Sequence, residues 1–190
     1  MRIFPHLISL MLIPYLTMQC SADDVQLNAT NAAERMKARN LIVKMYDNHV
    51  DQAISILQGS NKTDDDLAAK VLAIDVVEKL RAIRAIPVLI SNVEMDSGWL
   101  NLTEASSASI GEMYPAARAL VAIGKPSVPY CLTAIGQGEE KKREILCWVV
   151  ENIVGRESAV LMLRKRLSKA DGKVQHAFQA ALDLLKNNQK

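Results

Sequence analysis

A pattern of apolar residues at helical spacing recurs three times along this chain of 190 residues. The copies are Ile86, Leu89, Ile90 and Val93; Val128, Cys131, Leu132 and Ile135; and Val160, Leu163 and Leu167. The second and third copies start 32 residues apart, and the first and second start about ten residues further apart than that. A repeat of this size predicts stacked helical hairpins, each burying its apolar face against the next, rather than one closed globule.

The rest of the chain has the same helical character and no alternation typical of strands. Only 4% of the residues are aromatic, and Ala, Leu, Ile and Val dominate, which suits closely stacked small helices. We expect about eight helices in four antiparallel hairpins, an all-α fold arranged as an α-α superhelix. Early helical stretches are expected at 30–46 and 50–57. Residues 139–154 are apolar on nearly every side and should form the helix in the middle of the stack.

Capping and turn residues mark the expected helix ends. Thr63 followed by three aspartates predicts a helix start, because hydroxyl and carboxylate groups suit the free N–H groups there. Pro87 fits a first helical turn, where its missing N–H costs nothing. Gly124 predicts a left-handed helix end. Gly136 and Gly138 predict the link between the next two helices.

Residues 96–114 interrupt the repeat and supply the extra length between its first and second copies. The segment is rich in Ser, Asn and Gly and contains Trp99. Insertions in repeat proteins form loops on one face, which is often the binding face. The alternative is a loop whose Trp99 covers the exposed end of a helix pair. We therefore expect one solenoid domain over 23–190 with an inserted loop at 96–114.

Residues 1–22 have the pattern of a secretory signal peptide. A short basic start precedes an apolar run from Leu7 to Met18, and small residues follow, with cleavage expected after Ala22. The run is shorter than the roughly 20 residues that a membrane helix needs. Cys20 raises an alternative, a lipoprotein acylated on that residue, although Gln19 stands where a small residue is usual. We expect an exported protein, periplasmic or extracellular, that is anchored to a membrane only if Cys20 is lipidated.

Residues 116–129, AARALVAIGKPSVP, form an Ala-rich helix ending in Leu-x-x-Ile-Gly, a turn, and a second helix starting near Val-Pro. This segment resembles a HEAT repeat, in particular the short bacterial type of the phycobilisome lyases. Weaker copies of the same shape lie at 80–89 and 153–160. The resemblance implies an α-α superhelix that serves as a protein-binding scaffold. The family also includes lyases that attach bilins to antenna proteins, but these work inside the cell, which an export signal contradicts.

Cys131 and Cys147 are the candidates for a disulfide. Both fall on apolar helix positions, and their midpoint is residue 139, so on antiparallel helices they should lie at about the same height. An oxidising compartment would allow a bridge, worth about 3 kcal/mol on the chain-entropy model. The alternative is two buried free thiols that pack as small hydrophobic groups.

Charge is unevenly spread along the chain. Residues 23–124 contain 10 basic and 14 acidic residues, and residues 125–190 contain 12 basic and 7 acidic. Two basic triplets occur at 141–143 and 164–166. With few aromatic residues and an exported chain, we expect no nucleic-acid partner and interpret the triplets as solvated helix faces.

No catalytic, cofactor-binding or metal-binding constellation is evident. His49 and His176 have no Cys, Asp or Glu at the three- or four-residue spacing that a helical metal site needs. HEAT repeats share no catalytic residues, so the resemblance adds none. We expect an exported interaction scaffold without catalysis, which binds an unknown protein partner along a concave face lined by the second helix of each hairpin. The alternatives are a small-molecule-binding, lyase-like chaperone or enzyme that uses the concave groove, and a structural envelope lipoprotein.

Overall fold

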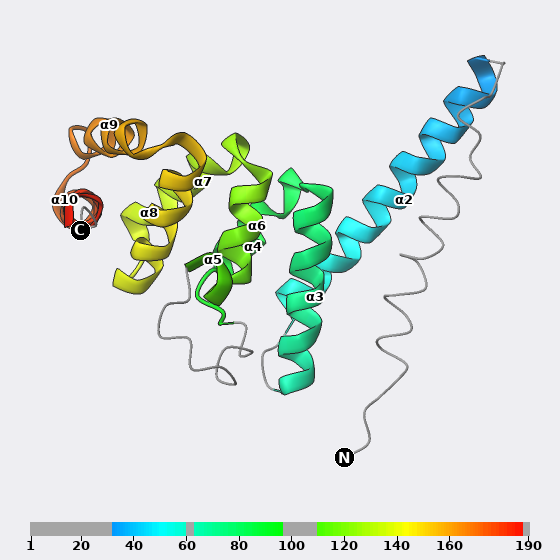
Figure 1. The fold of residues 1–190 in the computed structure, drawn as a ribbon, viewed down its shortest axis with the longest axis horizontal. Helices are drawn as coiled ribbons and strands as arrows, with labels where there is room; N and C mark the ends of the chain where they lie inside the picture. The colour runs from blue at the N-terminus through cyan, green and yellow to red at the C-terminus, as the bar shows by residue number, and fades with distance from the viewer. Residues whose placement is uncertain (1–31, 60–62, 97–109, 188–190) are drawn as a thin grey trace. The chain divides into compact units, whose positions relative to one another are not determined.

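The structure is a computed structural model that describes residues 32–59, 63–96 and 110–187. Within these ranges the chain is helical, its helices pack on one another, and no strand occurs (Figure 1). The predicted all-α class is confirmed. The expected signal peptide at 1–22, with Cys20, lies outside the described residues, as does Trp99 of the insertion.

The chain divides into two units, residues 1–47 and 48–190, and helix α2 (Ala32–Gln58) has residues in both. The separate helical stretches predicted before and after residue 48 are one continuous helix, because no Gly or Pro lies between them to interrupt its hydrogen bonds. In the first unit, α2 leaves about half of the surface of Leu41, Ile42 and Val43 exposed.

The second unit contains the end of α2 and all the helices that follow. These are α3 (Asp64–Leu80), α4 (Ile86–Ser91), α5 (Ile110–Met113), α6 (Pro115–Ile123), α7 (Val128–Gln137), α8 (Glu140–Val154), α9 (Arg156–Leu167) and α10 (Gly172–Asn187), with 3-10 turns η1 (Ile83–Ala85) and η3 (Lys125–Ser127) before α4 and α7. The first helices of the expected hairpins pack in order, α3 on α6, α6 on α8 and α8 on α10. Helix α4 packs on α6 and α7. Helix α7 packs on α8, which follows it in the chain, and also on α10.

Helix α8 lies in the middle of the second unit, as its nearly all-round apolar sequence predicted. It packs against α6 and α7, which precede it in the chain, and against α9 and α10, which follow it. Its buried residues are Ile145, Leu146, Cys147, Val149 and Val150. Each large aliphatic side chain buried in this way stabilises the fold by about 1.5–3 kcal/mol relative to exposure.

The ends of α3 show how local sequence places the helices. The sequence predicted a helix start with Thr63 as its cap, and the structure confirms it. The Asp66 N–H donates to Thr63 Oγ1 (3.1 Å) and the Thr63 N–H donates to Asp66 Oδ2 (3.2 Å), which together form a reciprocal capping box. At the other end Arg81 adopts a left-handed backbone with φ 48°. Its N–H and that of Ala82 bond back to carbonyls of the last turn of α3. This turn redirects the chain into η1.

The expectation that Gly136 helps to form a turn is wrong. Gly136 is buried inside α7, and Gly138 follows the end of that helix. A Cβ added to Gly136 would lie 3.1 Å from side-chain carbons of both Phe178 and Val174 on α10. Because the glycine has no side chain, α10 can approach α7 closely at this point.

The inserted loop predicted at 96–114 is not a loop throughout. Residues 110–113 form the single turn of α5, which packs on α6, and residues 97–109 lie outside the described residues. Gly111 lies under the indole ring of Trp148 from α8, since an added Cβ would be 2.8 Å from Cη2 of that ring. The end of the insertion is therefore held against the middle of the helix stack.

A buried polar cluster joins α2, α3 and α4. The Lys70 ammonium donates to Asn92 Oδ1 (3.2 Å), and Asn92 Nδ2 donates to the carbonyl oxygens of Leu57 (3.1 Å) and Val88 (2.8 Å). Lys70 is only 3% exposed, and this burial lowers its pKa, while the charge of Asp66 opposes the shift. Asn92 thus satisfies a carbonyl in the last turn of α2, which has no partner within its own helix, and also the buried ammonium.

Replacing Asn92 by leucine should lower the free energy of unfolding by about 2–4 kcal/mol, because the Lys70 ammonium and the Leu57 carbonyl lose their partner. Urea unfolding of the full chain measures the change. Adding Lys70→Met to Asn92→Leu should recover at least about 1 kcal/mol, since the double variant no longer buries a charge without an acceptor. Strictly additive losses in the double variant would contradict the coupling.

Candidate interaction surface

The most exposed large apolar side chains of the second unit lie on its second helices or in a turn that leads into one. Among the described residues of this unit, Leu161 on α9 is 65% exposed, Ile83 in η1 is 55% exposed and Tyr130 on α7 is 49% exposed. Leu72 on α3 (43%) and Val174 on α10 (37%) follow. Scattered exposed apolar residues are normal on a protein surface. Three of these residues, Ile83, Tyr130 and Leu161, lie on or just before the second helix of three successive helix pairs.

Helix α9 does not continue the packing of α4 on α7. Helix α7 makes its extensive contacts with α4, α8 and α10, whereas α7 and α9 do not pack extensively on each other. The close approach at Gly136 explains this arrangement, since it brings Phe178 and Val174 of α10 against α7. Helix α9 packs on α8 and α10 instead.

A half-open hollow of about 300 Å³ lies between α7 and α9. Leu132 from α7 and Met162 from α9 supply apolar lining. Lys165 and Arg166 in the last turn of α9, and Lys169 just after it, supply the cationic lining. Leu132 is 6% exposed, while the three cationic residues are exposed. The site therefore combines an apolar surface with positive charge.

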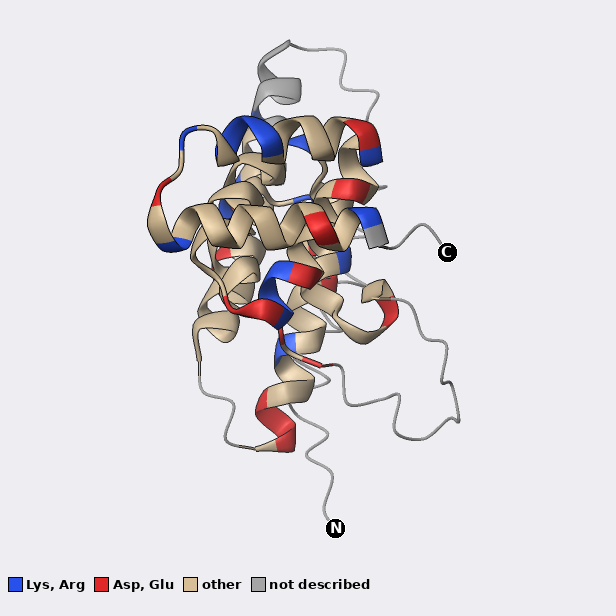
Figure 2. Ribbon diagram, turned by 90° about the vertical axis from the view of Figure 1, so that its left-hand side faces the viewer, with Lys and Arg blue, Asp and Glu red and all other residues tan. Residues whose placement is uncertain are grey.

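Basic residues gather where α9 ends and the chain turns toward α10 (Figure 2). Positive charge at this end of α9 has a structural benefit, because the C-terminal end of a helix dipole attracts cations. That benefit covers the last turn, in which Arg164, Lys165 and Arg166 lie. Lys169 lies beyond the helix end and gains less from it.

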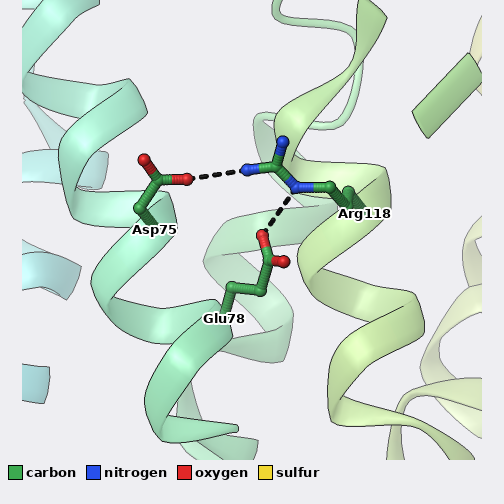
Figure 3. A network of polar contacts seen from close by, with 3 residues as sticks. All are labelled: Asp75, Glu78 and Arg118. Atoms are coloured by element: carbon green, nitrogen blue, oxygen red, sulfur yellow. Dashed lines mark hydrogen bonds and ion pairs between the residues drawn. The ribbon is translucent and has the colours of Figure 1, made fainter. Parts of the chain in front are cut away.

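Three other arginines among the described residues, Arg84, Arg118 and Arg156, are paired with carboxylates. Arg118 on α6 donates from Nη2 to Asp75 Oδ1 (2.7 Å) and from Nε to Glu78 Oε2 (2.8 Å), which links α6 to α3 (Figure 3). These hydrogen bonds and the two negative charges raise the pKa of Arg118. Arg156 pairs with Glu151 at 2.6 Å across the turn between α8 and α9. The paired side chains are partly exposed, so each pair contributes only about 0–1 kcal/mol to stability.

The basic triplet at 141–143 is engaged in contacts within the fold. The Lys141 ammonium lies 5.2 Å from the centroid of the Tyr114 ring, and Arg143 Nη2 donates to the Gly138 carbonyl (3.0 Å). In the part of the chain that the structure describes, Lys165, Arg166 and Lys169 form no ion pair. The two triplets, which look alike in the sequence, therefore differ in the structure.

Cys131 and Cys147 are both buried, at 0% and 2% exposure, and both are free thiols in the structure. The structure thus has the arrangement expected as the alternative to a disulfide, and a bridge in the oxidised protein stays a prediction. Burial raises the pKa of each thiol to about 12, and at Cys147 the charge of Arg143 opposes the shift. Because the thiolate is the nucleophile, neither thiol is reactive near neutral pH.

The remaining candidates from the sequence add no second site. His176 is exposed, as expected, and His49 is half-buried on α2. Among the described residues, no three His, Cys, Asp or Glu side chains are grouped so as to hold a metal ion. No single described helix is long and apolar enough to cross a membrane; α6 with the segment Lys125–Gln137 reaches that length and composition only as a pair, bent by 111°.

No family model, curated protein or solved structure matches the chain. Function must therefore be inferred from the sequence pattern and from the geometry of the described residues. The sequence identified Leu132 only as a member of the apolar pattern, and it did not single out Met162 or Lys169. Lys165 and Lys169 are four residues apart, but Lys169 lies beyond the end of α9, so helical spacing does not pair them. No sequence signal pairs Leu132 with the cationic residues, because Leu132 lies on α7, in another helix pair.

The two thiols should make the folded state less stable at alkaline pH. They stay protonated in the folded state up to about pH 12, whereas in the unfolded chain they titrate near their ordinary value of 9.0. Their contribution is therefore complete below pH 9 and is lost as the pH rises toward 12. At pH 10 the loss should be about 1.4 kcal/mol per thiol relative to pH 8.

Urea unfolding at pH 8 and pH 10 measures this loss, and the Cys131→Ala/Cys147→Ala variant, although less stable at both values, should lack it. An equal loss in that variant would contradict the assignment. Counting thiols in the protein isolated from its source and then denatured, with and without reductant, separates the two predicted states. Without reductant, two thiols besides Cys20 mean free cysteines, and no thiol besides Cys20 means a disulfide.

Proposed function

We propose that this protein is an exported scaffold built as an α-solenoid of HEAT-like repeats, which binds a partner protein along its second helices and has no catalytic activity of its own. The observation that carries the proposal is the exposure of Ile83, Tyr130 and Leu161, one in each successive second helix or its leading turn. Tyrosine and other large apolar groups anchor protein interfaces when a partner removes them from water.

The layered packing supports the solenoid part of the proposal. Helices α3, α6, α8 and α10 contact one another in chain order, and α4 contacts both α6 and α7. In repeat proteins each unit contacts mainly its neighbours, and the resulting extended surface is used for binding. The HEAT-like segment 116–129 corresponds to α6, η3 and the start of α7.

Site-specific crosslinking tests the binding surface. A photoreactive phenylalanine analogue placed at Tyr130 or at Leu161 should crosslink, in intact cells of the source, to a protein of the same mass at both positions. The same analogue at Leu72 provides the matched control, because this exposed leucine lies on α3, a first helix. Equal crosslinking at Leu72, or none at Tyr130 and Leu161, would contradict the proposal.

Export is tested at the N-terminus of the native protein. Mass spectrometry should find Asp23 as its first residue, since cleavage is expected after Ala22. An acylated Cys20 as the first residue would keep export but establish the lipoprotein alternative. A chain that retains Met1 would contradict export.

A further inference from the structure

The hollow between α7 and α9 combines an apolar lining with three cationic side chains. We infer that it binds a short acidic segment of the partner protein, with one large apolar side chain against Leu132 and Met162 and flanking carboxylates on Lys165, Arg166 and Lys169. The inference rests on the proposed scaffold function and gives the partner a chemical description.

Three arginines elsewhere in the described residues form ion pairs with carboxylates. Arg84 pairs with Asp51, Arg118 with Asp75 and Glu78, and Arg156 with Glu151. Lys165, Arg166 and Lys169 line one hollow and form no ion pair within the described residues. Three cations held around one space repel one another, and carboxylates placed between them would relieve that repulsion through charge-assisted hydrogen bonds.

The apolar lining distinguishes an acidic peptide from a bare anion. Leu132 and Met162 offer apolar surface, as do the aliphatic stems of the lysines and the arginine. Met162 is unbranched and polarisable, so it adapts to side chains of different shape. Among the described residues, no aromatic ring lines the hollow, whereas single-stranded nucleic acid is usually bound by stacking its bases on aromatic rings.

The size of the hollow points the same way. A volume of about 300 Å³ is at the lower end of the range for small-molecule pockets, roughly 300–1,000 Å³, and this hollow is only half enclosed. That space suits one large side chain of a peptide whose backbone stays outside. A peptide also brings carboxylates on both sides of its apolar residue. These can reach both the cations in the last turn of α9, Lys165 and Arg166, and Lys169 just after it.

The close packing of α7 on α10 gives the hollow a structural origin. Gly136 admits Phe178 and Val174 of α10 against α7, and α9 packs over α8 and α10 without extensive contact to α7. Leu132 lies one helical turn before Gly136 on α7. The same contact that departs from the regular repeat therefore leaves space beside Leu132.

A defined peptide tests the inference with the full mature chain. The probe is a fluorescein-labelled peptide with a central Leu-Phe pair flanked on each side by two glutamates, and binding is followed by fluorescence anisotropy. The variant K165Q/R166Q/K169Q should weaken binding at least tenfold. The control K125Q/R164Q/K173Q removes the same charge from exposed positions that do not line the hollow and should weaken binding less than twofold.

Met162→Trp, which fills the hollow, should also weaken binding at least tenfold, and Leu72→Trp should not.

Two further probes identify the chemistry. A peptide with Ser-Ser in place of Leu-Phe should bind at least fivefold more weakly, and one with lysines in place of glutamates should not bind. Equal losses in the two triple variants, equal binding of the Ser-Ser peptide, or tighter binding to phosphatidylglycerol vesicles or a single-stranded oligonucleotide would overturn the inference. So would failure of the probe to bind. In that case crosslinks through Tyr130 and Leu161 that persist in K165Q/R166Q/K169Q would show that the scaffold function stands without it.

Discussion

Helix α8 can bury Ile145, Leu146 and Val150 only because α6 and α7 lie on one side of it and α9 and α10 on the other. Each of the other helices has the same need, since an amphipathic helix of this length gains most of its stability from packing and little from its own hydrogen bonds. Helices α3, α6, α8 and α10 accordingly pack on one another in chain order, and α7 packs on both α8 and α10. Polar contacts such as Arg118 with Asp75 and Glu78 orient neighbouring helices but contribute far less than the buried apolar surface.

One departure from regular stacking connects the fold to the inferred binding site. At Gly136 the missing side chain lets α10 lie against α7, a position that a regular repeat would give to α9. The end of α9 then presents Lys165, Arg166 and Lys169 beside Leu132 without carboxylate partners in the described part of the chain. A cluster of unpaired cations costs little in water, and it becomes favourable when a ligand supplies the opposite charge. Positive charge there is consistent with the basic excess of residues 125–190.

Features that depend on neighbouring residues could be predicted from the sequence. The helix start at Thr63 and the central place of α8 follow from local residue types and apolar periodicity, and the structure confirms them. Features that depend on distant residues could not. Asn92 bonds to Leu57, 35 residues away, and Gly136 is buried because Phe178 from the last helix packs on it. The hollow also depends on distant residues, since Leu132 lies on α7 and Lys165 lies on α9.

Native-state hydrogen exchange of the full chain, resolved by helix, tests most directly whether stability is passed from neighbour to neighbour. The account predicts a gradient in the free energies of opening, highest in α8 and α6, lower in α3 and α9, and lowest in the part of α2 before residue 48. If all helices of the second unit instead opened together with one common free energy, they would share a single closed core, and the stacked architecture would be contradicted.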